Sequence, residues 1–168
     1  MTRGTVSGQV VIAVRNLYRN IHMFAALLSR RHIEGSLTPQ PTDNRGMACH
    51  PIVAALENEL SDNEILENVD GSTLMADQDW AAFTRAQPSI ELPAAAQWLL
   101  VLGNDLYKGI AGHVLPAGHL WKLAGGNDEI TAERWSFWQH RLRELATQDT
   151  ILGGGMTELC KRAANRMD

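Results

Sequence analysis

The stretch from Leu92 to Ile110, LPAAAQWLLVLGNDLYKGI, constrains this chain most, because as a helix it would be apolar around most of its circumference. A helix that is apolar nearly all round is usually enclosed by other helices. At about 100° per residue, one broad face holds five of its large or apolar residues: Ala95, Trp98, Leu99, Leu102 and Leu106. We therefore predict an all-α fold, a compact single-domain helical bundle around a buried central helix at 92–110, with long irregular loops.

Three residues near the ends of this stretch set its expected boundaries. Pro93 suits the first helical position, where the amide that proline lacks has no partner within the helix. Gly109 and Gly112 are plausible stops, because glycine readily adopts the left-handed conformation that ends helices. The run is too short and too polar for a bilayer, which needs about 20 apolar residues, so no transmembrane segment is expected.

Composition limits the class of protein. A chain of 168 residues with 45% hydrophobic and 20% charged residues is typical of one soluble globular domain. Cys49 and Cys160 lie far apart and form neither a metal-binding nor a redox spacing, so we interpret them as reduced thiols, with one disulfide as the alternative. We expect no metal and no cofactor. A net charge of −4 without a basic-aromatic patch argues against nucleic acid.

Periodicity and turn residues divide the rest of the chain into further elements. Around the central helix we predict a loop at 34–51, a helix at 51–60, a glycine-rich loop at 111–130, a tryptophan-rich helix at 132–147 capped by Thr131, and a C-terminal helix at 156–167. Ser61 and Glu64 match a capping box that would start a short helix, and 77–85 reads as another.

Residues 9–32 form a predicted amphipathic N-terminal helix. Its expected buried face, packed on the central helix, consists of Val11, Val14, Leu17, Tyr18, Ile21, Phe24, Ala25 and Leu28. His22 lies at the margin of this face, where a packing role is favoured over a catalytic one. The first 33 residues hold five arginines and no acid, a pattern that also occurs in mitochondrial transit peptides. We expect a cytoplasmic protein, with mitochondrial targeting as the alternative.

Two segments raise the question of metal or thiolate chemistry. Cys49 and His50 precede a helix, whose N-terminus lowers a thiol pKa, but adjacent side chains rarely point at one site. In the glycine-rich loop, His113 and His119 are six residues apart, which does not match the three- or four-residue spacing of a helical metal pair. A structural role is favoured for both segments.

One functional hypothesis is a small-molecule protein with an aromatic-lined apolar pocket. Its ligand-binding walls would be Trp98, Tyr107, Trp121 and Trp135. The candidate catalytic groups are His113, His119 and Asp105, which lies at the border of the apolar face just before the glycine-rich loop. Without a cofactor, such a site could serve a cyclase, isomerase or dehydratase, where shape and one acid or base suffice.

The favoured hypothesis is a non-catalytic helical interaction or scaffold domain, with a homodimer as a possible assembly. Phe137 falls off the buried face of its helix, among charged neighbours that would form a partner surface with it: His140, Arg141 and Glu144. An aromatic in such surroundings either packs under the C-terminal segment, which we prefer, or contacts a partner. The basic N-terminal helix is the other candidate surface, although such a basic face is ordinarily only solvated.

The C-terminal half carries a resemblance. Ala95-Ala96-Gln97-Trp98, Leu106-Tyr107, the run ITAERWSFWQHRL at 130–142, and Ala163-Ala164 followed by Met167 resemble an uncharacterised family of fungal helical proteins. The resemblance implies an all-α fold and an intracellular fungal origin, and it brings no catalytic residues. Because small fungal proteins of this kind sometimes act in secondary metabolism, it adds some weight to a small-molecule role.

Overall fold

The computed structural model describes residues 4–35, 44–59, 88–148 and 154–168. These residues form the helices α1 (Gly4–Ile33), η1 (Asn44–Ala48), α2 (Cys49–Leu56), α4 (Pro88–Leu102), α5 (Asn104–Ile110), α6 (His119–Leu123), α7 (Ala132–Leu145) and α9 (Gly154–Arg166). In this part of the chain the extended pairing is limited to one bridge between Val114 and Glu129. The predicted all-α class is confirmed.

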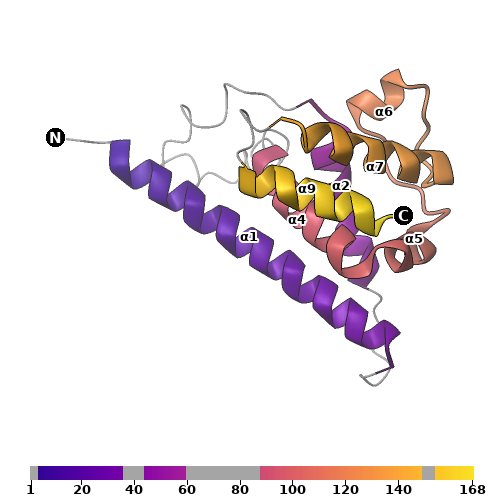
Figure 1. Cartoon of the computed structure of the whole chain (residues 1–168), viewed down its shortest axis with the longest axis horizontal. Coiled ribbons are helices and arrows are strands. Elements are labelled where there is room, and N and C mark those ends of the chain that lie inside the picture. Colours follow the sequence, from indigo (N-terminus) through magenta and orange to yellow (C-terminus); the bar gives the residue numbers. More distant parts are fainter. Residues whose placement is uncertain (1–3, 36–43, 60–87, 149–153) are drawn as a thin grey trace.

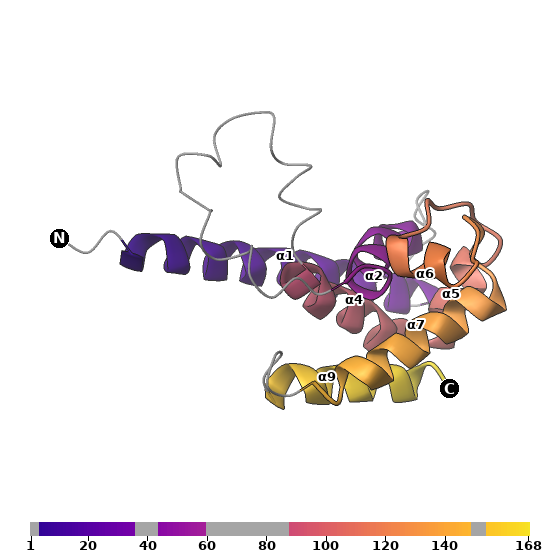
Figure 2. The same cartoon turned by 90° about the horizontal axis from the view of Figure 1, so that it is seen from above.

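Helix α4 lies at the centre of the bundle and contacts α1, α2 and α9 (Figure 1). Seen from above, α1 and α9 lie on opposite sides of α4 (Figure 2). Its largest buried side chains, Leu92, Trp98, Leu99 and Leu102, are almost completely shielded from solvent. A three-alanine run, Ala94–Ala96, is buried as well and lets neighbouring helices approach closely. The prediction of a buried central helix is therefore confirmed for this part of the stretch.

The prediction of one unbroken helix over 92–110 is wrong. The chain breaks at Gly103, whose φ of 51° and ψ of −130° are open only to glycine, and α5 starts at the next residue. A Cβ atom at Gly103 would lie 2.5 Å from the backbone oxygen of Arg166 at the end of α9. The apolar pattern runs on through the break because α4 and α5 both face the core, so periodicity alone does not reveal it.

The two ends of the stretch also differ from prediction. Pro93 lies inside α4, which begins five residues earlier at Pro88, so it is not the first helical residue. Gly109 lies within α5 and packs against the guanidinium of Arg45. Gly112, with φ of 77°, follows the end of α5 as expected.

Helix α1 is longer than predicted and packs on a different face. The side chains turned toward the core are small or polar: Ala25, Ala26, His22 and Ser29 are buried. Leu17, Ile21 and Phe24, which we expected in the core, are 62%, 49% and 64% exposed. Tyr18 and Leu28 are half-buried, and the side chains of Val11 and Val14 lie outside the described residues. The predicted packing face is thus wrong for Leu17, Ile21 and Phe24.

Several other elements begin or end at residues that differ from the predicted ones. Part of the expected loop at 34–51 is helical, because η1 and the start of α2 lie within it. A short helix, α6, lies inside the glycine-rich loop. Thr131 caps α7 by accepting a hydrogen bond from the Arg134 amide at 3.3 Å, as predicted. The helices expected after Ser61 and at 77–85 lie outside the described residues.

Both cysteines are free and buried, as their spacing indicated. Burial raises the pKa of the Cys49 thiol, and it raises that of Cys160 to about 12, so both thiols are protonated at neutral pH. Across the described ranges, no helix combines the length and the apolar character needed to cross a membrane.

Candidate functional site

Asp105 does not meet a histidine. It lies on the first turn of α5, where its carboxylate accepts hydrogen bonds from Lys108 at 3.0 Å and from Arg30 of α1 at 3.2 Å. The bond from Lys108 lowers the pKa of this carboxyl group, and the charge of Arg30 acts in the same direction. With a third of its side chain exposed, Asp105 belongs to a surface ion cluster that ties α1 to α5.

The two histidines of the glycine-rich loop, His113 and His119, are both exposed. The backbone of His113 pairs with Ile130, and the amide of His119 points at the side-chain oxygen of Asn58. In the described parts of the chain no hydrogen bond or ion pair joins either imidazole to Asp105. The three candidate catalytic groups therefore remain separate in this structure.

The four aromatic side chains expected to line a pocket are divided among three places. Tyr107 contacts Trp135 with ring centroids 5.3 Å apart, while Trp121 contacts Phe137 at 5.1 Å. Trp98 lies on the side of α4 that faces α1, with its ring 6.4 Å from His22. Three of these rings lie in the hydrophobic core or pack against it, and Trp121 packs on Phe137 of α7.

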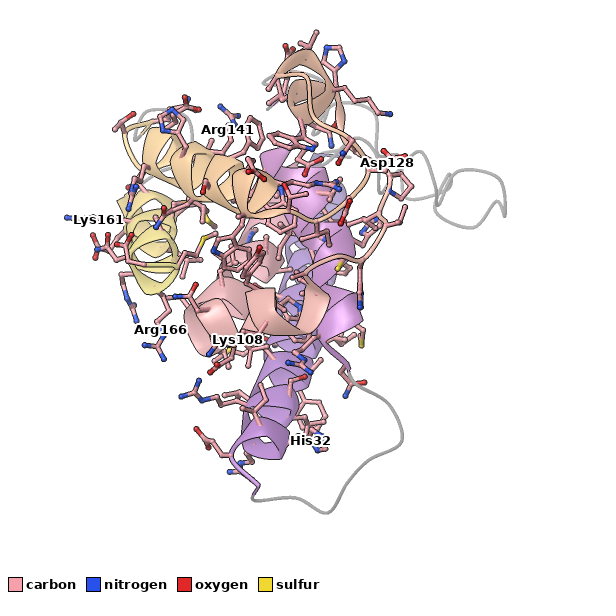
Figure 3. All side chains as sticks on the ribbon, turned by 90° about the vertical axis from the view of Figure 1, so that its right-hand side faces the viewer. His32, Lys108, Asp128, Arg141, Lys161 and Arg166 are labelled. Carbon is pink, nitrogen blue, oxygen red and sulfur yellow. The ribbon has the colours of Figure 1, made fainter. Side chains whose placement is uncertain are left out.

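The expected partner surface on α7 is largely satisfied within the chain. Phe137 is half-buried beneath α6 through its contact with Trp121, so our preference for packing under the C-terminal segment named the wrong element. Glu144 accepts a hydrogen bond from Arg141 at 2.6 Å and lies 3.1 Å from His140. Arg141 is labelled on this helix in Figure 3.

A buried ion pair that we did not predict joins α2 to α7. Glu57 and Arg134 are both fully buried, with Arg134 Nε 2.7 Å from Glu57 Oε1 and Nη2 3.0 Å from Oε2. The same carboxylate accepts hydrogen bonds from Trp138 Nε1 and from the Gly118 amide, each at 2.6 Å. A carboxylate with all of its acceptor positions in use repays much of the cost of burying its charge.

Arg134 also organises the glycine-rich loop. Its Nη1 donates to the carbonyl oxygens of Leu115 and Asp128 at 2.9 and 3.0 Å, and its Nη2 reaches that of Pro116 at 3.4 Å. All five N–H groups of the guanidinium therefore have acceptors. We call Glu57 and Arg134 the central ion pair. Through the hydrogen bonds of Arg134, this pair holds the 111–130 loop on the bundle.

A second polar network lies between α1, α2 and α4. Tyr18 donates a hydrogen bond to Glu91 Oε2 at 2.7 Å, although Glu91 is only 2% exposed. The other carboxylate oxygen lies 3.9 Å from Nδ1 of His50, whose own side chain is 63% exposed. Burial raises the pKa of Glu91, against the smaller effects of Tyr18 and His50. Burial, with the Glu91 charge, also raises the pKa of Tyr18, so the phenol stays protonated.

His22 continues this network on the inner face of α1. Trp98 Nε1 donates to His22 Nδ1 at 2.9 Å, and the Tyr18 ring lies 4.4 Å from the imidazole. Because Nδ1 accepts, the bond requires neutral imidazole with its proton on Nε2. Burial lowers the pKa of His22, and the nearby His50 lowers it further. His22 is a buried packing residue, which confirms the role that we favoured for it.

This network gives a pH prediction for the variant Glu91→Gln. A folded-state pKa above the ordinary 4.5 means that Glu91 contributes stability at low pH, which is lost as pH rises through the folded value. Glutamine removes this loss and still offers Tyr18 an oxygen. We expect the unfolding free energy of the variant, minus that of the wild type, to increase in urea titrations as the pH rises above the ordinary Glu pKa of 4.5.

His22 changes the pH dependence of stability in the opposite direction to Glu91, but it is present in both the wild type and the Glu91→Gln variant. Its folded-state pKa lies below the ordinary 6.5, so its contribution is complete above that pH and is lost on acidification. The difference between wild type and Glu91→Gln therefore isolates the carboxyl group. A difference that stays constant across the pH range would contradict a raised pKa at Glu91.

Among the described residues, four exposed large apolar side chains lie on the outer face of α1. Leu17, Ile21, Phe24 and Leu27 are between 45% and 64% exposed and follow one another at helical spacing, and we call them the outer stripe. Arg31 comes four residues after Leu27 and continues the same face. Arg19 and Arg31 are exposed, and neither has an ion-pair partner among the described residues.

The sequence held a signal for one of these features. Arg134 lies four residues before Trp138 and directly before Trp135, so it interrupts an apolar helix face, which indicates a buried charge with a partner. Glu57 and Glu91 give no such signal, because each stands beside an apolar run at a helix end.

Within the described ranges, no group of three or more His, Cys, Asp or Glu side chains is placed to hold a metal ion.

The comparisons with known proteins point to one family. Neither the search of the curated proteins nor that of the solved structures found a match. Residues 9–142 match a protein family of unknown function, DUF3632, from within α1 almost to the end of α7. The match includes the N-terminal half, which the resemblance noted in the sequence left out. The chain belongs to the DUF3632 family.

Proposed function

We propose that this chain is a helical interaction domain that docks on its partner through the outer stripe of α1. One observation carries the proposal: α1 presents large apolar side chains to solvent and turns small or polar ones inward. Single exposed hydrophobic residues are common on protein surfaces. A contiguous row of leucine, isoleucine and phenylalanine along one helix face is not, and such patches mark interaction sites.

The inner face of α1 supports this assignment. Ala25 and Ala26 allow close packing on α4, and His22 and Tyr18 are engaged with Trp98 and Glu91. The hydrogen bonds from Trp98 to His22 and from Tyr18 to Glu91 fix the rotation of the helix, so the outer stripe cannot turn inward without breaking them. The Ser29 hydroxyl is also buried on this face, without a hydrogen-bond partner in the described structure. The stripe is therefore available to a partner while the domain stays folded.

Site-specific photo-cross-linking tests the proposal. A benzophenone amino acid at Phe24, in the full chain expressed in cells, is expected to give an intermolecular adduct, because this ring is 64% exposed at the centre of the stripe. The control places the same group at Ser136, which is exposed on α7 away from α1. Mass spectrometry of the adducts identifies what is attached at each position.

The proposal requires an adduct of the same composition from positions 21 and 24 that is absent from position 136. A second copy of the chain, another protein or a lipid would each satisfy it. Cross-links from position 24 that run only into the same chain would overturn it, because the stripe would then be covered internally.

A small-molecule enzyme without a cofactor is the second candidate, and Glu91 is the observation in its favour. A buried carboxyl group with a raised pKa, beside Tyr18 and the exposed His50, is the kind of group used in acid–base catalysis. Native mass spectrometry of freshly purified protein separates the two candidates. A small molecule that is retained by the wild type and lost from Glu91→Gln would favour the enzyme.

A further inference from the structure

We infer that the partner of the outer stripe is an anionic lipid surface, and this inference rests on the proposed function. Amphipathic helices with Phe and Leu on one side and arginines on the other lie in the plane of a membrane interface, with the apolar side chains inserted. Helix α1 runs for 30 residues, which corresponds to about 45 Å, and it combines the outer stripe with the exposed cations Arg19 and Arg31. Each exposed cation near such a surface adds attraction to acidic headgroups.

The shape of the molecule suits a flat partner. Helix α1 forms one outer edge of the fold, and the other helices all lie to one side of it (Figure 1). The N-terminal part of α1 extends past α4 when the molecule is seen from above (Figure 2). Figure 3 labels His32 at the C-terminal end of α1, where Arg30 bonds to Asp105 of α5. A planar surface can therefore approach α1 only from the side that faces away from the other described helices.

Charge distinguishes lipid from a second copy of the chain. Residues 1–33 contain five arginines and no acid, whereas the remaining residues hold 10 of the 15 basic and all 19 acidic residues. Two α1 helices packed through their stripes would each bring an arginine-bearing, acid-free segment to the contact, and like charges repel across an interface. An anionic bilayer instead attracts α1 and repels the acidic remainder, so charge also fixes the orientation of the domain on the surface.

Vesicle binding tests the inference with the full chain. We expect sedimentation with phosphatidylcholine vesicles that contain phosphatidylglycerol, little binding to phosphatidylcholine alone, and a large loss of binding in high salt, because screening weakens the attraction of exposed charges. Phe24→Ser should weaken binding about tenfold or more, since inserting a phenyl ring is worth at least that factor. The double variant Arg19→Gln/Arg31→Gln should lower it by a similar factor on acidic vesicles.

Leu123→Ser is the matched control. Leu123 is 70% exposed, slightly more than Phe24, but it lies on α6 away from α1. We expect this variant to bind acidic vesicles as the wild type does. Equal losses in Leu123→Ser and Phe24→Ser, equal binding to neutral and acidic vesicles, or no binding of the wild type would each overturn the inference.

The lipid inference and the interaction domain can fail separately. If acidic vesicles do not bind the wild type while position 24 still cross-links to another protein, the lipid inference falls and the interaction domain stands. If position 24 cross-links only within the chain, both fall.

Discussion

Replacing Arg134 with methionine is expected to lower the free energy of unfolding by about 3–5 kcal/mol, because it leaves the Glu57 carboxylate buried without its counter-charge. Both side chains are fully buried, so water cannot take the place of the guanidinium. The variant also loses the donors to Leu115 and Asp128 that hold the glycine-rich loop. Urea unfolding followed by circular dichroism measures the loss.

Two further variants separate this effect from a general loss of arginine. Arg143→Met removes an exposed cation that pairs with Asp168, and surface pairs of this kind contribute about 0–1 kcal/mol. In the double variant Arg134→Met/Glu57→Gln neither position carries a charge, so its loss should be clearly smaller than the sum of the losses in Arg134→Met and Glu57→Gln. Additive losses would show that the central ion pair is not an energetic unit.

Replacing Gly103 with alanine is expected to cost about 3 kcal/mol or more. The residue has φ of 51° and ψ of −130°, a conformation that costs a non-glycine residue about 1–3 kcal/mol. The new methyl group would also lie 2.5 Å from the backbone oxygen of Arg166, so α9 would have to shift. The same urea titrations measure this loss.

Two glycines serve as controls for this substitution. Gly112→Ala shares a positive φ, 77°, but meets no atom within 4 Å, so it should show the strain without the clash. Gly46→Ala has neither feature and should be close to neutral. If Gly103→Ala cost no more than Gly112→Ala, the close approach of α9 to the break between α4 and α5 would be incorrect.

Much of the fold followed from periodicity. The all-α class, the burial of Trp98 and Leu99, and the Thr131 cap came from the spacing of apolar residues and from capping chemistry. The break at Gly103 did not, because its cause is a carbonyl group from α9, more than 60 residues further along the chain. Periodicity records which residues face the core and not where a distant backbone forces the helix to stop.

The outer stripe of α1 was not predicted as a site. The strongest apolar pattern of this helix predicts a packing face, whereas in the structure it faces solvent. Specific contacts decided the rotation of the helix: the Trp98–His22 and Tyr18–Glu91 hydrogen bonds turn polar groups inward and leave Phe24 outside. Each contact joins residues more than 70 positions apart, so neither partner could be identified from the local sequence. Only the basic, acid-free character of the first helix indicated a surface role.

The orientation of α1 is the central claim, and thiol labelling of the variant Phe24→Cys tests it most directly. The two native cysteines are buried and serve as internal references, with Cys160 fully shielded from solvent. Under native conditions we expect a thiol-reactive dye to modify position 24 at a rate close to that of a free peptide thiol, while Cys49 and Cys160 react only after denaturant is added. Protection of position 24 equal to that of Cys160 would contradict an exposed outer stripe.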